Sequence, residues 1–511
     1  MAREPLVIGP FAGGLNTYDD ATAIKDTELV ECTNWDPGLE GSLRSRPPFH
    51  SEDAPLTLGA SGDARLLGFY YTGTTTYLFA SDGLSSTWAY NGSSWSLVTD
   101  TFAATAMVQF DNKAWMSSPV GESSPGGYWT SSGGFTADAD MPHGDTIVAH
   151  KSRLWTSSGK GNPEGTRVYY SKVLGQPDFW DSPAFIDIGQ GDGQDIVRLT
   201  TYYNTLVAFR TQSVYSFAFN SDPAQGNISL LVPGVGLASR DCLIEHENYL
   251  YFMYDEKAYQ FVNNNAQQIN IKVPFTASSQ AGIAYPFAVS LFNNRAIFHY
   301  YDTMYVYSLR TRTWTKWRST EHTAIGQIMS PAGVLTDEAY ALPSVEVATG
   351  GSRECDLLKI EDRITAATES FSCEIRTKNY SYQLSSNFKR LFWWGVDATF
   401  RDRVQGWAIP IVHHMQVTWN QLYSDGVTWG QLLAGTWGSP YIGDLSLNTD
   451  YDLGGTGPIR KFVKMFKSMR FRQIQFRVVF DTDGGIGTAP VNLFTLTAYV
   501  ETKETVSKSV S

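Results

Sequence analysis

Short apolar strands recur along the chain at a nearly constant interval. Each copy opens on a polar residue, continues as a short apolar strand, turns, and ends in a second strand with a central aromatic residue. The copies begin roughly 36 to 52 residues apart, the interval at which one sheet of a β-propeller recurs. The first strands begin at Thr76, Asn112, Ser152, Asn204, Asn248, Asn294 and Asp337, and the second strands contain Tyr90, Trp129, Tyr170, Phe217, Phe261, Tyr307 and, in the weakest copy, Ile360.

A single sheet of this kind has two apolar faces and cannot bury both alone. Radial stacking covers each face with a neighbouring sheet and leaves only short edges. The repeat therefore predicts a β-propeller of about seven blades, or six, over residues 61–365. The strand that closes such a ring usually comes from the opposite end of the chain. We expect Ser42–Arg46 or the segment after Ile360 to supply it, and the N-terminal segment to complete the weak copy near Asp337.

The pattern changes after about residue 370, where longer alternating strands replace the repeat. These strands predict a C-terminal β-sandwich or platform domain over residues 366–511. Residues 1–60 are rich in turn signals and are expected to contribute to ring closure or to contacts between subunits. The predicted long strands are Phe371–Asn379, Arg390–Thr399, Ala408–Thr418, Arg470–Phe480 and Asn492–Thr502.

Composition supports an all-β protein of more than one domain. The chain has 511 residues, 14% of them aromatic, with 45 glycines and 22 prolines spread between the predicted strands. Its formal net charge of −12 disfavours gripping of nucleic acid, which depends on Lys and Arg neutralising phosphates. The same charge suits a surface along which DNA slides without sticking, or serves ordinary solubility.

The cysteines and the N-terminus show no recognisable metal-binding, disulfide or secretion motif. Cys32, Cys242, Cys355 and Cys373 form no CxxC pair, which argues against a zinc site or a disulfide framework, although Cys355 and Cys373 could come close at the end of the propeller. The N-terminus lacks the apolar core of a signal peptide, and no stretch reaches the roughly 18 apolar residues of a membrane span.

No catalytic constellation stands out among the polar residues. The adjacent His413 and His414 point to opposite sides of a strand and cannot easily share a metal. A GxSxG motif is absent. The Ser81–Trp88 stretch resembles a sialidase Asp-box, but its Asp and Gly are mis-spaced and it does not recur. We therefore predict no enzyme activity, and no catalytic, cofactor-binding or metal-binding residues.

Three further segments leave two interpretations open each. The Asp/Gly loops Asp187–Asp195 and Asp481–Gly485 could ligate calcium, yet neither completes an EF-hand, and turn formation explains both. The Trp419–Trp437 run could stack on sugars of a host surface, or it could pack at a subunit interface.

Three stretches resemble the tail nozzle and packaged-DNA stabilisation proteins of short-tailed bacteriophages. The C-terminal part is also similar to minor tail proteins of long-tailed phages. The first stretch contains Gly13, Gly14, Asn34, Gly41, Arg44, Arg46 and Pro47; the second runs from Arg167 through Pro177, Trp180, Gly189, Asp192 and Gly193 to Tyr215; the third is Phe471–Val478.

The resemblance implies a structural virion protein of the phage tail. Such a subunit would form a homo-oligomeric ring, commonly of six, that continues the DNA channel, retains the packaged genome and releases it at infection. Its partners would be its own copies, adjacent tail or connector proteins, tail fibre or plug proteins, and genomic DNA passing through the lumen without sequence-specific contact. Asp138 and Asp140 lie in an acidic loop that is a candidate for the channel lining. The alternative is a minor tail protein that binds a host receptor or glycan.

Overall fold

The computed structural model describes most of the chain. The described residues are 4–58, 64–158, 164–176, 179–180, 184–189, 191–276, 287–319, 325–331, 338–343, 347–349, 352–361, 369, 371–380, 389–400, 405–413, 457–471, 473–482 and 492–502. Over these residues the fold is all-β, as predicted, with one short 3₁₀ helix, η1 (Pro223–Gln225).

The chain folds into two compact units and passes between them repeatedly. Unit 1 contains Met1–Pro48, Ser308–Arg318 and Arg363–Ser511, and unit 2 contains Phe49–Tyr307 and Ser319–Asp362. The repeating part of the sequence is thus inserted between pieces of unit 1, which is assembled from both ends of the chain and one central segment.

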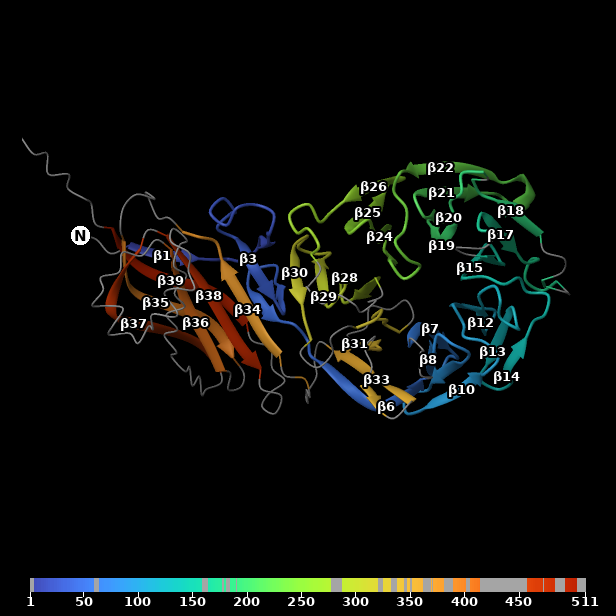
Figure 1. Cartoon of the computed structure of the whole chain (residues 1–511), viewed down its shortest axis with the longest axis horizontal. Coiled ribbons are helices and arrows are strands. Elements are labelled where there is room, and N and C mark those ends of the chain that lie inside the picture. The colour runs from blue at the N-terminus through green and yellow to red at the C-terminus, as the bar shows by residue number, and fades with distance from the viewer. Residues whose placement is uncertain are drawn as a thin grey trace, which may run out of the picture. The chain divides into compact units, whose positions relative to one another are not determined.

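Unit 2 is built from small antiparallel sheets that follow one another in chain order (Figure 1). Five sheets of its described part consist of four consecutive strands, which is consistent with propeller blades. They are β7–β10 (Arg65–Tyr71, Thr76–Ser81, Thr87–Tyr90, Trp95–Thr99), β11–β14 (Ala106–Phe110, Lys113–Ser117, Gly126–Thr130, Gly134–Ala137), β15–β18 (Thr146–His150, Arg153–Ser157, Arg167–Tyr170, Ala184–Asp187), β19–β22 (Ile196–Tyr202, Thr205–Arg210, Ser213–Ala218, Asn227–Pro233) and β23–β26 (Leu243–His246, Tyr249–Tyr254, Lys257–Val262, Asn265–Gln268).

In five of the repeats the opening polar residue lies in the tight turn between the first two strands of a sheet: Asn112, Ser152, Asn204, Asn248 and Asn294. Thr76 is instead the first residue of β8, and Asp337 lies outside the described residues. Asn112 and Ser152 have positive φ values of 52° and 58°, and so do the residues directly before them. Two consecutive left-handed residues form the type I′ turn, whose twist matches that of the flanking strands. The recurring polar position is therefore a hairpin signal, and the two strands read from the sequence are the second and third strands of each sheet.

Two further sheets complete the series. One is formed by β27 (Ala288–Phe292), β28 (Arg295–Tyr300) and β29 (Thr303–Ser308), which are the first three strands of a nine-stranded sheet. The other has β33 (Ser352–Glu361) at its centre, paired with β31 (Glu338–Ala341), β32 (Val347–Thr349) and β6 (Phe49–Leu58). The N-terminal segment thus completes the last sheet, as expected.

The closing strand differs from the two candidates that the sequence offered. Leu43–Ser45 forms β5 in unit 1, and the closing strand is β6, which begins directly after Pro47-Pro48. The two prolines cannot donate to a sheet ladder and so separate the two strands. In β6 the side chains of Phe49, Ala54 and Leu56 are buried.

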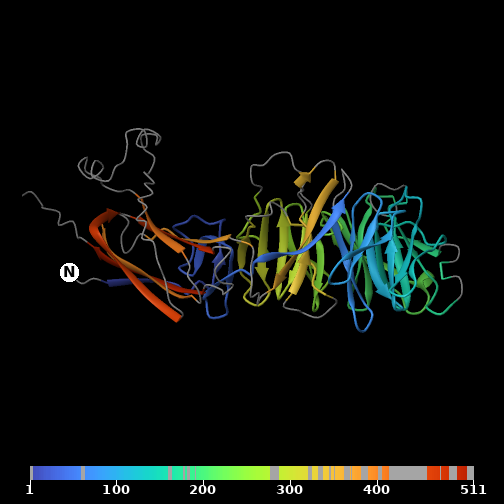
Figure 2. The same cartoon turned by 90° about the horizontal axis from the view of Figure 1, so that it is seen from below.

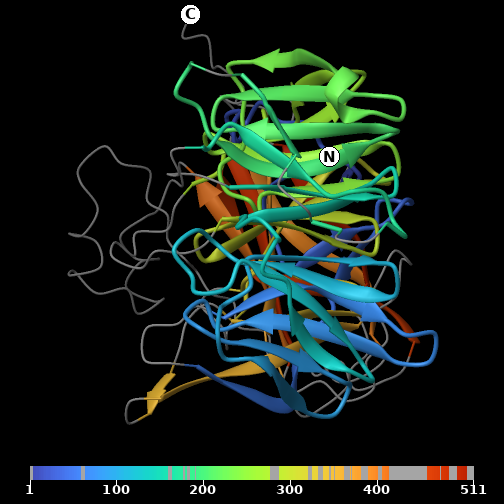
Figure 3. The same cartoon turned by 90° about the vertical axis from the view of Figure 1, so that its right-hand side faces the viewer.

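Successive sheets of unit 2 pack through their first strands and share apolar cores. β7 lies against β11, β11 against β15, β15 against β19, and β23 against β27. Leu56 and Leu357 of the last sheet share one core with Leu78 and Tyr90 of the first sheet. The series is therefore closed on itself. Figure 1 shows the sheets following one another around this unit, and Figure 3 shows the unit from its side.

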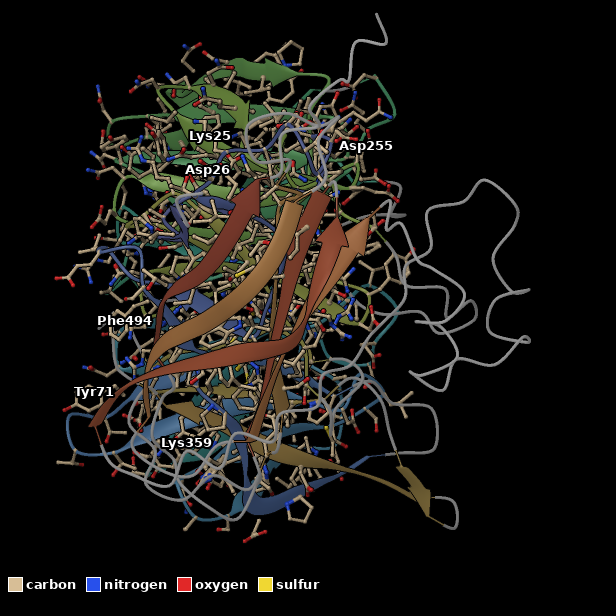
Figure 4. The ribbon with its side chains drawn as sticks, turned by 90° about the vertical axis from the view of Figure 1, so that its left-hand side faces the viewer. Lys25, Asp26, Tyr71, Asp255, Lys359 and Phe494 are labelled. Atoms are coloured by element: carbon tan, nitrogen blue, oxygen red, sulfur yellow. The ribbon has the colours of Figure 1, made fainter. Side chains whose placement is uncertain are left out.

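Unit 1 consists of two larger sheets, whose long curved strands are seen in Figures 2 and 4. Trp35 of one sheet and Phe480 of the other meet edge to face, with ring centroids 5.9 Å apart. One sheet has the order β37-β35-β39-β5-β4, with β1 also paired to β39, and the other contains β30-β3-β34-β38-β36, with β2 paired to β3. Their bounds are β1 (Glu4–Ile8), β2 (Gly14–Leu15), β3 (Glu28–Thr33), β4 (Trp35–Pro37), β30 (Trp314–Trp317), β34 (Phe371–Thr377), β35 (Lys389–Phe400), β36 (Gln405–His413), β37 (Gly457–Phe471), β38 (Gln473–Thr482) and β39 (Asn492–Thr502).

Each of the five long strands predicted from the sequence has a counterpart in unit 1. β39 has the predicted bounds, and β34 and β35 agree within about two residues, the usual error of a strand boundary. β36 ends at His413, earlier than predicted, and the predicted Arg470–Phe480 strand corresponds to β38. The sequence did not assign a strand to Gly457–Phe471, because its alternation of basic and apolar residues overlaps that of the next strand.

We expect the closing core to be a principal source of stability in unit 2. Leu357 is fully buried in the core that joins the last and first sheets. Replacing it with alanine should lower the free energy of unfolding by about 2–5 kcal/mol, because the cavity cannot collapse fully. Leu97→Ala, on an exposed position of β10, is the matched control and should change it by less than about 0.5 kcal/mol. Equal effects in urea unfolding would contradict the assignment of the closing core.

Candidate functional site: an axial cavity and two buried arginines

A cavity of about 750 Å³ opens among the loops that join the sheets of unit 2. Its lining comes from the start of β7, the turn after β8, the loop before β11, the loop between β12 and β13, and Asp145 before β15. Further lining comes from β19, the β20–β21 turn, the segment between β22 and β23, and the β24–β25 turn. These regions belong to the first five sheets of the series. The cavity therefore lies where the sheets converge, on the axis of the ring they form.

An ion pair crosses this axis beside the cavity. Arg65 Nη2 of β7 contacts Asp241 Oδ2, which lies just before β23. Arg198 of β19 donates hydrogen bonds from Nη1 to the carbonyls of Arg240 and Leu243, at 2.7 and 2.8 Å. The pair joins the first sheet to the fifth, and Arg198 joins the fourth to the fifth. Side chains consequently cross the middle of unit 2 beside the cavity.

Asp145 lines the cavity, and its carboxylate is partly buried there. Its backbone N–H donates to the Ser157 carbonyl at 2.9 Å, whereas its carboxylate accepts no hydrogen bond from the described residues. Burial raises the pKa of Asp145 to about 6, and the positive charge of Arg65 only partly opposes this shift. A carboxylate without donors in a partly buried site is held at a cost in free energy.

Two other ionic side chains in the cavity are also without a protein partner. Among the described residues, neither the Glu122 carboxylate nor the Arg240 guanidinium makes a hydrogen bond or a salt bridge. Asp255 lines the same cavity but forms an exposed pair with Lys257 at 3.1 Å. The cavity thus presents three unsatisfied charges, which is a common property of binding sites.

The Asp187–Asp195 loop, considered above for calcium, encloses the guanidinium of Arg210 instead. Asp192 accepts from Arg210 Nη1 at 2.8 Å and from Nη2 at 2.5 Å, and the Gly189 carbonyl accepts at 3.1 Å. Gly189 has φ +69°, and a Cβ there would lie 2.1 Å from Arg210 Nη1. A protein cation therefore takes the Asp192 carboxylate and the Gly189 carbonyl of this loop, and a second one, Arg167, pairs with Asp187 at 3.2 Å.

A second buried arginine organises unit 1. Arg46 is 1% exposed and forms a bidentate pair with Glu369, at 2.7 and 3.0 Å. It also donates to Asn34 Oδ1 at 3.0 Å and to the carbonyls of Pro47 and Arg318 at 2.8 and 2.9 Å. We call this set the Arg46 hub.

Asn34 extends the hub. Its backbone has φ 61°, its Oδ1 accepts from the Arg318 N–H at 2.7 Å, and its Nδ2 donates to the Ser372 carbonyl at 2.7 Å. Asn tolerates the left-handed region better than most residues. The hub thus joins the N-terminal, central and C-terminal segments of unit 1.

The remaining sequence candidates have structural positions or lie outside the described residues. In the Ser81–Trp88 stretch, Asp82 Oδ1 accepts the N–H groups of Leu84, Ser85 and Ser86, which is a turn cap. His413 ends β36, and Asp481 lies in β38. His414, the loop after Thr482 and the Trp419–Trp437 run lie outside the described residues.

The acidic loop and the cysteines are also placed. Asp138 and Asp140 lie between β14 and β15, do not line the cavity, and are linked by a hydrogen bond from Asp140 N–H to Asp138 Oδ1 at 3.2 Å. All four cysteines are buried and free. Cys355 belongs to unit 2 and Cys373 to unit 1, where Cys32 on the adjacent strand is its cysteine neighbour.

Sequence reasoning missed the cavity and both arginine environments. Asp145, Glu122 and Arg240 come from separate loops, and no spacing rule links them. A signal for Arg210 was available, because it ends the otherwise apolar β20 and the nearest Asp/Gly loop precedes it. In the described part of the chain, no three His, Cys, Asp or Glu side chains are grouped to hold a metal ion. No described helix is long and apolar enough to cross a membrane.

Comparisons with known proteins give only remote likeness. No family model and no curated protein matches the chain. Similar solved structures include the extracellular domain of the putative hybrid two-component system BT4673 from B. thetaiotaomicron (TM-score 0.42, 11% identity, 68% of this chain and 42% of that one). Others are the AfRom2 CNH domain (0.38, 8%, 61% and 100%) and PorZ, a surface component of the type-IX secretion system of Porphyromonas gingivalis (0.35, 9%, 66% and 44%). The chain spans less than half the length of the first and third, and these scores support no inference about it.

We expect the loss of one charge from the Arg46 hub to destabilise the fold. Glu369→Gln leaves the Arg46 guanidinium buried without its counter-ion, which should lower the free energy of unfolding by about 3–5 kcal/mol. Lys257→Gln removes the exposed pair with Asp255 and should change the free energy of unfolding by less than about 1 kcal/mol. Chemical denaturation of both variants tests this, and a Glu369→Gln effect as small as that of the control would refute it.

The raised pKa of Asp145 predicts a pH dependence of stability. Between pH 4 and 6 the folded state binds more protons than the unfolded state, so this group's contribution to stability falls as pH rises and is lost above about pH 6. Asp145→Asn cannot titrate and should exceed the wild type in stability above pH 6, by about 1–2 kcal/mol after allowance for solvent screening. Denaturant unfolding at pH 4, 5, 6 and 7.5 measures the difference. A constant difference across these values would contradict the prediction.

Proposed function

We propose that the chain is a structural subunit of a bacteriophage tail. It forms a homo-oligomeric nozzle or tail-tip ring that continues the DNA channel, retains the packaged genome and releases it at infection. In finer detail, unit 2 is a seven-bladed β-propeller and unit 1 is a β-sandwich platform. The seven sheets, with the last completed by β6, support the blade count. The edge-to-face contact between Trp35 of one sheet and Phe480 of the other supports the sandwich.

The observation that carries the proposal is the position of the residues behind the phage resemblance. Asn34, Arg46 and Pro47 of the first stretch belong to the Arg46 hub. Gly189 and Asp192 of the second stretch enclose Arg210. The third stretch lies partly in β38, where Ile474 and Phe476 are buried. The residues behind the resemblance therefore stabilise the fold, as expected if this chain and the phage tail proteins have the same architecture.

Side chains that cross the axis of unit 2 limit where DNA could pass. The Arg65–Asp241 pair and Arg198 occupy the centre of the ring of sheets. A DNA duplex cannot pass through such a unit. The channel of the proposed assembly must accordingly lie between copies of the chain. A net charge of −12 suits a wall that lets DNA move past without binding it.

The oligomeric state of the purified full chain tests the proposal. Analytical ultracentrifugation should detect a single closed oligomer, and electron microscopy should show rotationally symmetric rings with a central opening wide enough for a DNA duplex. A gel-shift assay with duplex DNA at physiological salt should show no tight binding, because the acidic surface offers few phosphate contacts. A chain that stays monomeric at every concentration, or that binds duplex DNA tightly, would count against the proposed role.

A further inference from the structure

We propose that the axial cavity of unit 2 is a binding site for an organic cation, an alkylammonium or guanidinium group. The cavity measures about 750 Å³, within the range of small-molecule sites, and its walls come from loops of several sheets. Glu122 and Asp145 line it, and neither carboxylate has a hydrogen-bond or salt-bridge partner among the described residues. This site is independent of the proposed role in a phage tail.

The charge of the lining selects a cation over an anion. Of the two arginines in the cavity wall, Arg65 is already paired with Asp241, which leaves Arg240 as the unpaired guanidinium. Asp255 is likewise paired, with Lys257, which leaves Glu122 and Asp145 as two unpaired carboxylates against one unpaired guanidinium. An anion would meet more repulsion than attraction in this environment, whereas a cation would meet the reverse.

The geometry selects an extended cation with N–H donors over a metal ion. Metal ions require several oxygen ligands that converge on one point, and no such group of side chains occurs among the described residues. Carboxylates that are spread around a cavity are reached instead by a molecule carrying separated N–H groups. Tyr254 also lines the cavity, and aromatic rings attract ammonium and guanidinium groups.

Binding would remove a defect in the unliganded site. The Asp145 carboxylate is partly buried and receives no hydrogen bond, and Arg65, Arg240, Glu122 and Asp255 are the charged groups around it. A ligand ammonium or guanidinium would supply charge-assisted hydrogen bonds, which are among the stronger ones in proteins. A free polyamine and a Lys or Arg side chain of a partner protein have this chemistry in common.

Isothermal titration calorimetry on the full chain distinguishes these sources. Spermidine serves as the free polyamine, and acetyl-Gly-Arg-Gly-amide presents a guanidinium from a peptide. We expect at least one of them to bind with one-to-one stoichiometry. Binding of spermidine alone indicates a free polyamine as ligand, and binding of the peptide alone indicates a protein side chain. If neither probe binds, the proposal is wrong.

Matched variants separate the cavity from general attraction to an acidic protein. Asp145→Asn and Glu122→Gln should each weaken binding at least about tenfold, which corresponds to one lost charge-assisted hydrogen bond. Glu247→Gln removes one exposed negative charge outside the cavity and should leave the affinity unchanged. Thermal melting should show that all three variants are folded. Binding that is equally strong in Asp145→Asn, or equally weakened in Glu247→Gln, would overturn the proposal.

Discussion

The burial of a single arginine charge constrains the architecture of unit 1. A guanidinium removed from water must be neutralised and hydrogen-bonded, or it destabilises the fold by several kcal/mol. Arg46 meets this requirement only when Glu369, Asn34 and the carbonyls of Pro47 and Arg318 converge on it. Three of these residues lie close to places where the chain leaves or re-enters unit 1. The hub therefore fixes the ends of the segments between which unit 2 is inserted.

Unit 2 obeys a different constraint, the closure of a series of sheets that cannot bury their faces alone. Radial packing through first strands places loops from distant parts of the sequence around one axis. Closure depends on β6, because Leu56 and Ala54 share the core that joins the last sheet to the first. The same closure creates the axial cavity, so the site exists only when the ring is complete.

The repeat and the long C-terminal strands could be predicted because both are local patterns. Period-two alternation and left-handed polar turns such as that before Lys113 specify hairpins within about ten residues. The closing strand was mispredicted because Ser42–Arg46 and Phe49–Leu58 both resemble strands, and only tertiary packing decides which one pairs with β33. The cavity residues Glu122, Asp145 and Arg240 could not be predicted at all, because their association is produced by the ring and not by any sequence spacing.

The buried charged residues differ in whether the protein itself supplies partners for their charge. Arg46 and Arg210 are fully buried, and the charge of each is neutralised by a carboxylate of the protein, with backbone carbonyls as further acceptors. Asp145 is partly buried and lacks donors, and burial raises its pKa to about 6. Such a defect is costly to retain in a framework position, where a neutral side chain would be more stable. Its persistence in the wall of a cavity is understandable if a molecule that binds there supplies the missing positive charge.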